Sequence, residues 1–279
     1  CPLKSRDAKR QSSFLRRYPN VDKVLITTVP FGAKSRLPLE LLEGVGAQYL
    51  FNPHNTRMTE DQLAELVSDI DVMIAGTEPI TDRVMARAPR LKLISRVGIG
   101  LDSVDLIAAK RRGIKVSYTP EAPAPAVADL TIAMMLVLLR SVHVANAGMH
   151  RGEWQRLFGR RLAEVTIGII GVGRIGGRVL RCTRAFGTPR VLVNDISPNR
   201  GLDREIKLEW VTKEQIYEEA DVICLHVPLT RQTRQMIQRE QLLAMKPDAI
   251  IINTARGGII NEQDLYDVMK AGHLSGAAI

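Results

Sequence analysis

A run of apolar residues that breaks into glycines is the part of the chain best suited to hold a ligand. It reads Val165-Thr-Ile-Gly-Ile-Ile-Gly171-Val-Gly173-Arg-Ile-Gly176, with GxGxxG between a strand-like run and a helix-like run. This spacing permits a tight turn, lets backbone N–H groups approach a pyrophosphate, and lets the helix pack closely on the strand. The phosphates would lie at the positive end of that helix. The alternative is a glycine turn without a ligand.

An acidic residue follows the glycines at the distance that a dinucleotide site requires. Asp195 lies nineteen residues after Gly176 and ends a second apolar run, Val191-Leu-Val-Asn-Asp195. Its carboxylate would accept hydrogen bonds from a ribose 2′-hydroxyl and repel a 2′-phosphate. The pairing predicts a dinucleotide-binding domain whose cofactor is NAD rather than NADP.

An arginine downstream is the strongest candidate for a substrate anchor. Arg256 stands in Ile252-Asn-Thr-Ala-Arg256-Gly-Gly, just past a predicted strand that should end at the cofactor crevice. A guanidinium there can hold an α-keto carboxylate and polarise the carbonyl during hydride transfer. From position alone, a surface arginine at a strand end fits equally well.

A second glycine turn lies earlier in the chain, in Ser95-Arg-Val97-Gly98-Ile99-Gly100-Leu-Asp102. Its backbone N–H groups could form an anion nest for a substrate carboxylate. A simple strand-to-helix turn is the alternative interpretation.

The histidines offer one residue near the expected crevice. His226, in Cys224-Leu-His226-Val-Pro228-Leu-Thr230, ends a predicted strand, and its apolar setting favours a cofactor wall over proton transfer. Solvated or packed side chains are expected for the other four, His54, His143, His150 and His273. No cluster of His, Cys and Asp has the spacing of metal ligands.

Strands and helices that alternate along the chain must position these residues. In the first part of the chain, the expected strands are 24–28, 47–52, 72–75, 91–97 and 114–118, with helices over 39–43, 59–70, 81–88 and 104–112. Thr59 is expected to begin the second of these helices, and Gly113 to end the last with a left-handed cap. This alternation predicts a doubly wound parallel sheet.

A proline-rich linker, Pro120-Glu-Ala-Pro-Ala-Pro125, leads into a long helix expected from Ala126 to about Met149. Its apolar side is expected to face a domain or subunit and contains Leu130, Met134, Val137 and Leu138. Later strands are expected at 191–194, 222–227 and 249–253, with helices such as 241–245 and 263–270.

Composition indicates a cytoplasmic globular protein that binds no membrane. The 279 residues include three cysteines without CxxC spacing, and no apolar run approaches the roughly 20 residues that a membrane helix needs. Residues 1–17 carry +5 of the net charge of +9, so the charge does not indicate a nucleic-acid partner. A flexible basic leader over residues 1–20 is expected; a polyanion-binding arm or an organelle presequence are the alternatives.

From about Val24 onward, the chain resembles the D-isomer-specific 2-hydroxyacid dehydrogenase family, and specifically its phosphoglycerate dehydrogenase-like branch. The resemblance rests on the glycine motif and on five further segments in the family's order, namely residues 95–105, 126–130, 151–154, 224–230 and 253–257. It implies a flavodoxin-like substrate domain over 21–120 that lacks its C-terminal return segment. It also implies an NAD-binding Rossmann domain over 121–279 that is truncated at its C-terminal end.

The resemblance also assigns roles to residues. It implies that Val97 and Gly98 bind the substrate carboxylate and that Arg256 is the catalytic arginine. The positions expected to bind NAD are Ile99, Gly171, Gly173, Arg174, Ile175, Gly176, Asp195, His226, Val227, Pro228, Thr233, Thr254 and Ala255.

The implied activity is hydride transfer between the nicotinamide and C2 of a D-2-hydroxy acid or 2-keto acid, with 3-phosphoglycerate among the candidates, in a homodimer. The family's nicotinamide-binding aspartate, its acid/base histidine and the glutamate that tunes that histidine would fall beyond Ile279. The chain as given is therefore expected to hold half of a catalytic apparatus. The alternative hypothesis is an NAD-sensing corepressor-like protein without turnover.

Overall fold

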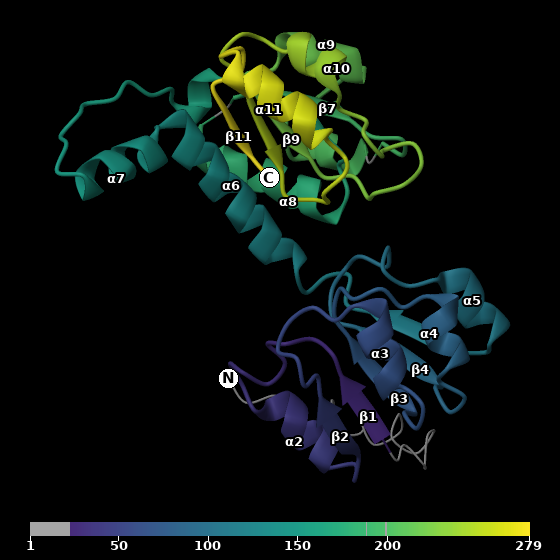
Figure 1. Ribbon diagram of the computed structural model, residues 1–279. Helices are drawn as coiled ribbons and strands as arrows, with labels where there is room; N and C mark the ends of the chain where they lie inside the picture. The colour runs from purple at the N-terminus through teal and green to yellow at the C-terminus, as the bar shows by residue number, and fades with distance from the viewer. Residues whose placement is uncertain (1–22, 188, 199) are drawn as a thin grey trace. The chain divides into compact units, whose positions relative to one another are not determined.

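The chain folds into two α/β units, each built on its own parallel sheet (Figure 1). The computed structural model describes residues 23–187, 189–198 and 200–279. The first unit ends at Ala122 and the second begins at Pro123. The predicted leader, residues 1–20, lies outside the described residues.

The first unit has a five-stranded parallel sheet in the order β2-β1-β3-β4-β5, which is the flavodoxin-like order predicted for it. Each strand lies within two residues of its predicted position, because short apolar runs between helices are strong strand signals. The strands are β1 (Lys23–Ile26), β2 (Gln48–Phe51), β3 (Val72–Ala75), β4 (Leu93–Arg96) and β5 (Lys115–Tyr118).

Four helices connect these strands, and local signals set their ends. Thr59 caps α3 through a capping box with Gln62, and Gly113 follows α5 with a φ of +72°, as predicted. The helices are α2 (Leu37–Glu43), α3 (Glu60–Leu66), α4 (Asp82–Ala86) and α5 (Leu106–Arg111). Most are shorter than predicted because the flanking residues form capping turns and loops.

The second unit has a six-stranded parallel sheet in the order β11-β10-β9-β6-β7-β8. Numbered within the unit, this order is that of the Rossmann fold, with β6 at the centre. The strands are β6 (Thr166–Ile170), β7 (Arg190–Asn194), β8 (Glu209–Trp210), β9 (Val222–Leu225), β10 (Ile250–Asn253) and β11 (Gly276–Ala278).

Alternate residues of the central strands face two separate cores. Ile167 and Ile169 of β6 lie in the core under α6 (Ala124–Leu139) and α8 (Arg174–Thr183). Ile170, one position on, lies in the opposite core, whose helices are α9 (Lys213–Glu219), α10 (Arg239–Leu243) and α11 (Glu262–Lys270). Both faces of the sheet are therefore covered, which is why its strands are almost wholly apolar.

The prediction of one long helix over residues 126–149 is wrong in one respect, because the structure has two helices there. α6 ends at Leu139, and α7 (Val142–His150) begins after Ser141, whose φ of +51° is left-handed and cannot continue a helix. No glycine or proline marks this break in the sequence. Leu130 lies on the exposed side of α6, whereas Ile132 and Met135 pack in the core.

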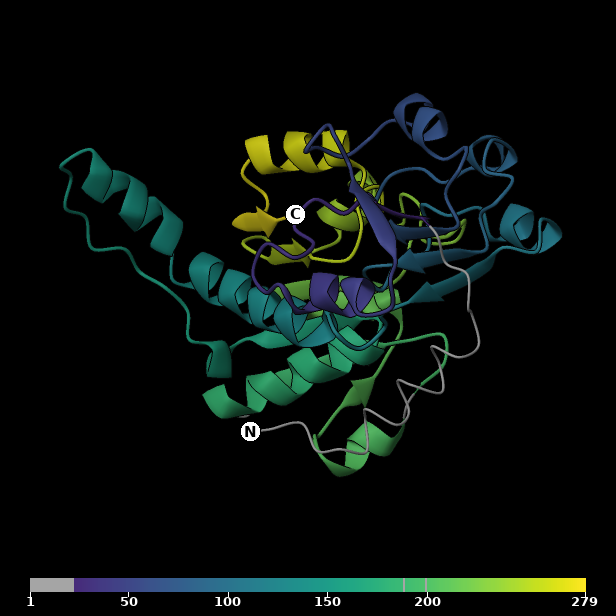
Figure 2. The ribbon, with the colours of Figure 1, turned by 90° about the horizontal axis from the view of Figure 1, so that it is seen from below.

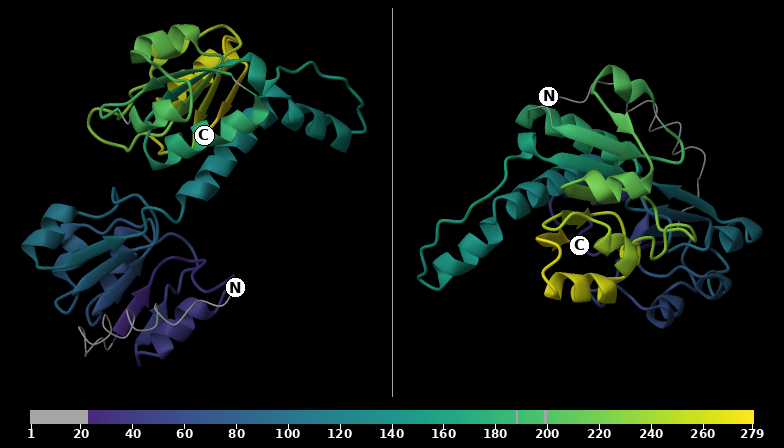
Figure 3. Two further views of the ribbon diagram at one scale, coloured as in Figure 1. Left: turned by 180° about the vertical axis from the view of Figure 1, so that it is seen from behind. Right: turned by 90° about the horizontal axis from the view of Figure 1, so that it is seen from above.

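Helix α7 and the loop after it project from the body of the second unit (Figures 2 and 3). No residue of α7 is buried. Within the described ranges, no single helix is long and apolar enough to cross a membrane; α6 and α7 reach the length only together, with a bend of 68° between them.

Candidate cofactor and substrate site

The predicted dinucleotide turn lies between the end of β6 and the start of α8. Gly171 has a φ of +99°, and a Cβ there would lie 2.7 Å from the carbonyl carbon and oxygen of His226. Its N–H donates to the carbonyl of Asn194 at 2.8 Å. Only glycine fits this position, both by conformation and by space.

The other two glycines of the motif are required for different reasons. A Cβ on Gly176 would lie 2.1 Å from the carbonyl oxygen of Gly171, so this residue sets how closely α8 approaches the turn. A Cβ on Gly173 would meet no atom within 4 Å. Packing within the protein therefore does not require glycine at this position, but a pyrophosphate approaching the helix N-terminus would.

Asp195 lies at the edge of this turn. Its carboxylate accepts the N–H of Val172 at 2.6 Å and the N–H of Ser197 at 2.8 Å. Each oxygen is thus fixed by one backbone donor and keeps acceptor capacity for a ribose hydroxyl. The turn, the ten-residue helix behind it and the fixed carboxylate fit a dinucleotide with an unmodified ribose.

His226 forms the wall beside Gly171. The backbone N–H of His226 donates to the carbonyl of Ile170 at 2.8 Å. Both ring nitrogens are buried without a hydrogen-bond partner among the described residues. Burial lowers the pKa of His226 to about 4, so the ring is neutral at pH 7. This favours the wall over proton transfer, as the sequence suggested.

The loop after β9 is closed by a threonine hydroxyl. The Thr233 hydroxyl donates to the carbonyl of Pro228 at 2.6 Å and accepts the N–H of Thr230 at 2.7 Å. Val227 lies next to Gly171, since its Cγ1 would be 3.0 Å from a Cβ on that glycine. These contacts hold the predicted residues 226–228 beside the dinucleotide turn.

Arg256 stands in a loop that the side chain of Asn253 organises. The Asn253 amide donates to the carbonyl of Arg256 at 2.8 Å and accepts the N–H of Ala255 at 3.1 Å. The Arg256 guanidinium donates to the carbonyl of Ala255 at 2.8 Å. The hydroxyls of Thr254 and Thr131 lie 2.8 Å apart and tie the loop to α6.

A small cavity of about 110 Å³ lies against this loop, lined in part by Asn253, Gly257 and Gly258. Sequence reasoning missed the positioning roles of Asn253 and Thr131. The asparagine directly before Thr-Ala-Arg was a usable signal, because Asn side chains commonly bond to the backbone two residues on. The threonine gave none, because its partner is 123 residues away.

The second glycine turn follows β4 in the first unit. Gly98 has a φ of +139°, and its N–H donates to the hydroxyl of Thr119 at 2.8 Å. The N–H of Val97 donates to Ala75 at 2.9 Å. Both predicted donors are therefore engaged within the unit, and a carboxylate that bound the Gly98 N–H would replace the Thr119 hydroxyl. Ile99 continues the same turn.

The structure gathers the predicted residues of the second unit at one edge of its sheet. They follow β6, β7, β9 and β10, which are neighbours in the sheet, and all at carboxyl ends. Arg174, Ile175 and Gly176 form the first turn of α8. Val97, Gly98 and Ile99 belong to the first unit, at the carboxyl end of β4. Among the described residues, no cluster of His, Cys, Asp and Glu could hold a metal ion.

Fold and site together define a nucleotide-binding α/β protein of the dehydrogenase type. Residues 132–279 match the family model described as "D-isomer specific 2-hydroxyacid dehydrogenase, NAD binding domain". The chain belongs to this family, and its second unit is the family's NAD-binding domain.

Relatives and solved structures agree with this assignment. The chain is 39% identical over 246 residues to D-3-phosphoglycerate dehydrogenase of Methanocaldococcus jannaschii, covering 86% of the chain and 46% of that protein. It is 35% identical to hydroxypyruvate reductase of Thermotoga maritima, covering 85% and 79%. The structure of Aquifex aeolicus D-lactate dehydrogenase with NAD and lactic acid matches with a TM-score of 0.79 and 29% identity, covering 91% and 75%.

Replacing Gly173 by alanine should separate folding from cofactor binding. We expect Gly173→Ala to unfold within about 2 °C of the wild type, because the new methyl group meets no protein atom. The methyl group would occupy the path of the pyrophosphate, so NADH affinity should fall about 100-fold, which equals about 2.7 kcal/mol. Thermal unfolding and NADH fluorescence titration measure the two effects.

Gly176→Ala is the matched control, because its methyl group would clash with the Gly171 carbonyl and should lower the free energy of unfolding by at least about 2 kcal/mol. Unchanged NADH affinity in Gly173→Ala would contradict the assignment of the turn.

The buried ring of His226 predicts a dependence of stability on pH. Because the pKa is about 4 when folded and 6.5 when unfolded, the unfolded state binds more protons between these values. Stability from this residue is complete above pH 6.5 and declines as pH falls toward 4. His226→Leu should reduce the slope of unfolding free energy against pH in that window by up to about 1.4 kcal/mol per pH unit.

The exposed His54 provides the control, since it lies outside α7 and His54→Leu should keep the wild-type slope. Urea unfolding at pH 4.5, 5.5, 6.5 and 7.5 measures both variants. Equal slopes for His226→Leu and the wild type would refute the burial of a neutral ring.

Proposed function

We propose that the protein is an NAD-dependent oxidoreductase that transfers a hydride between the nicotinamide and C2 of a D-2-hydroxy acid or its 2-keto acid. The observation that carries the proposal is the Gly173 position, which the protein fold leaves open and a pyrophosphate would need, beside a fixed Asp195 carboxylate. Arg256 follows β10, which is separated from β6 by β9, at the same edge of the sheet.

Bound NAD would supply the hydride acceptor, and the chain's own residues bind and orient the cofactor and the substrate. The turn from Gly171 to Gly176 presents backbone N–H groups to the pyrophosphate, and Asp195 accepts from the ribose hydroxyls. The backbone of His226 forms the wall beside the turn, and its buried neutral ring adds no charge there.

Arg256 is the residue proposed to act on the substrate. Its guanidinium would hold the carboxylate and donate to the carbonyl oxygen, where negative charge develops as hydride arrives at C2. The loop that Asn253 organises presents the guanidinium from a fixed backbone. The Val97–Gly98 turn of the first unit is proposed to supply the Gly98 N–H to a substrate carboxylate once Thr119 releases it.

The substrate class follows from the relatives. Their names include D-3-phosphoglycerate dehydrogenase, hydroxypyruvate reductase and glyoxylate reductase, which all point to small 2-hydroxy or 2-keto acids. We assign this class to the chain, with 3-phosphoglycerate as one candidate.

Substitution of Arg256 tests the proposed chemistry. With each keto acid of a panel of 3-phosphohydroxypyruvate, hydroxypyruvate, glyoxylate and pyruvate, Arg256→Gln should lower kcat/KM by about 10²- to 10³-fold, because a charged donor to the developing oxyanion is lost. The kcat/KM of Arg256→Lys should lie between those of the wild type and Arg256→Gln, since lysine keeps the charge but loses the planar guanidinium. NADH oxidation at 340 nm measures the rates.

NADH affinity should be unchanged in both variants, which separates substrate contact from cofactor contact. Wild-type protein that binds NADH and oxidises it with none of these acids would contradict the dehydrogenase proposal and favour a sensing role. Full activity in Arg256→Gln would contradict the role of the arginine but not the dehydrogenase proposal.

We further propose a homodimer that pairs through the projecting arm formed by α7 and residues 151–160. The arm exposes Trp154 by 83% and Phe158 by 97%, together with Val142 and Met149. Large apolar side chains concentrated on a projecting segment are typical of a subunit interface.

Light scattering on the 31.0 kDa chain should give the mass of a dimer. Trp154→Ser with Phe158→Ser should shift the protein to a monomer without loss of NADH binding. Ile107→Ser on α5 removes another exposed apolar side chain and should leave the dimer intact. A monomeric wild type would contradict the proposal.

A further inference from the structure

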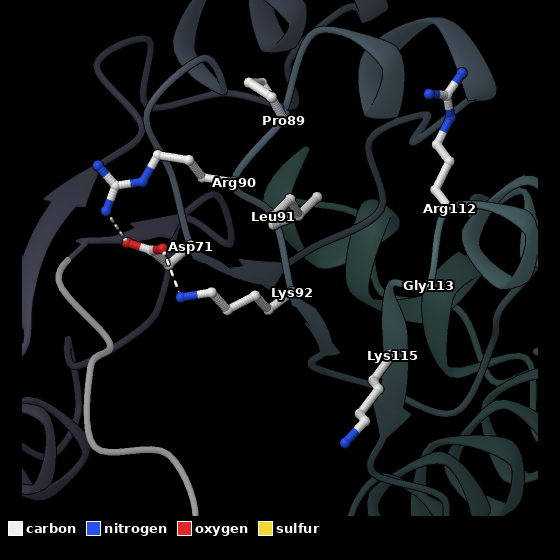
Figure 4. A pocket seen from close by; sticks show the side chains of 8 residues that line it. All are labelled: Asp71, Pro89, Arg90, Leu91, Lys92, Arg112, Gly113 and Lys115. Atoms are coloured by element: carbon white, nitrogen blue, oxygen red, sulfur yellow. Dashed lines mark hydrogen bonds and ion pairs between the residues drawn. The ribbon is translucent and has the colours of Figure 1, made fainter.

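The first unit has a basic cavity of about 530 Å³ at the amino-terminal edge of its sheet, away from the Val97–Gly98 turn. Four cationic side chains and one carboxylate line it, namely Arg90, Lys92, Arg112, Lys115 and Asp71 (Figure 4). The walls therefore carry a net charge of +3 at pH 7.

Three neighbouring strands bring these side chains together. Asp71 directly precedes β3, Lys92 precedes β4, and Lys115 opens β5. Because β3, β4 and β5 are adjacent and parallel, their amino ends meet at one edge of the sheet. The cluster is thus fixed by the topology and not by one flexible loop.

Asp71 holds one side of the cavity in place. Its side chain is 1% exposed, and it accepts from Arg90 at 2.8 Å, from Lys92 at 3.1 Å and from the N–H of Lys23 at 3.2 Å. Burial acts to raise the pKa of Asp71, but hydrogen bonds from Lys92, Arg90 and Lys23 outweigh it and leave the pKa below its usual value. The carboxylate therefore stays ionised and holds two cations at the cavity wall.

On the opposite side, Arg112 is held by Asp82, a carboxylate that does not line the cavity. The Arg112 guanidinium donates to Asp82 at 2.7 Å, and Arg111 contacts the same oxygen at 2.7 Å. One carboxylate is thus shared by two guanidinium groups, so it offsets only part of their charge. Figure 4 shows Arg112 and Lys115 across the cavity from Arg90 and Lys92.

We propose that this cavity is a second ligand site, which binds a small molecule carrying phosphate. Basic side chains from separate elements line a volume within the range of small-molecule pockets. Phosphate matches an excess of three positive charges better than a single carboxylate does. Carboxylates hold Arg90, Lys92 and Arg112 in place before binding, which lowers the entropic cost of ordering them.

The position of the cavity separates it from the proposed reaction. β4 runs from Lys92 at the cavity to the Val97–Gly98 turn at its other end, so a ligand here lies at the opposite edge of the sheet from the proposed substrate contact. The cavity is therefore separate from the Val97–Gly98 turn, and its ligand is not the acid proposed to bind there.

Calorimetric titration of the full chain with inorganic pyrophosphate tests the site. Saturating NADH is present, so that the pyrophosphate cannot bind the Gly171–Gly176 turn. We expect saturable binding of one pyrophosphate per chain at low salt. Lys92→Gln with Lys115→Gln should weaken it at least 10-fold, and NADH affinity should not change.

Two controls make the result specific. Lys207→Gln with Lys270→Gln removes the same charge from the second unit and should leave pyrophosphate binding intact. Lys115→Glu alone should weaken binding by a similar factor and leaves the contacts of Asp71 in place, which covers a loss of stability in the double variant. No saturable binding, or equal losses in the cavity and control variants, would overturn the proposal.

Discussion

The close contact between the carbonyl oxygen of Gly171 and the Cα of Gly176 is the constraint on which the site depends. A methyl group at position 176 would lie 2.1 Å from that oxygen, so helix α8 can begin directly against the end of β6 only because the residue is glycine. This contact aims the helix N-terminus at the space above Gly173. It also places the turn beside His226, whose carbonyl would meet any side chain on Gly171.

The sheet order of the second unit then determines what surrounds that space. Because β7, β9 and β10 lie close to β6 and run parallel to it, the residues after their carboxyl ends share one edge. Asp195, His226 and the Asn253 loop are far apart in sequence and are brought to this edge by topology alone. Each is fixed by backbone contacts before any ligand binds, so the geometry does not have to be built during binding.

Sequence predicted the strands and the dinucleotide turn well, because both depend on local patterns. Apolar runs buried on two faces stand out from their surroundings, and glycine spacing reports directly on backbone geometry. The break at Ser141 was not predictable, since nothing in the residue types there excludes a continuous helix. The two-residue strand β8 is too short to leave a periodic signal. Contacts such as that between Thr119 and Gly98 join distant residues and follow only from the folded unit.

Discrimination between NADH and NADPH tests the account most directly, because it depends on the Asp195 carboxylate being held beside the turn by Val172 and Ser197. Fluorescence titration of the full chain with each cofactor gives the two affinities. The account predicts that NADH binds at least about 10-fold more tightly, a difference of about 1.4 kcal/mol, and that Asp195→Ser removes most of this preference. Equal affinities in the wild type, or tighter binding of NADPH, would contradict it.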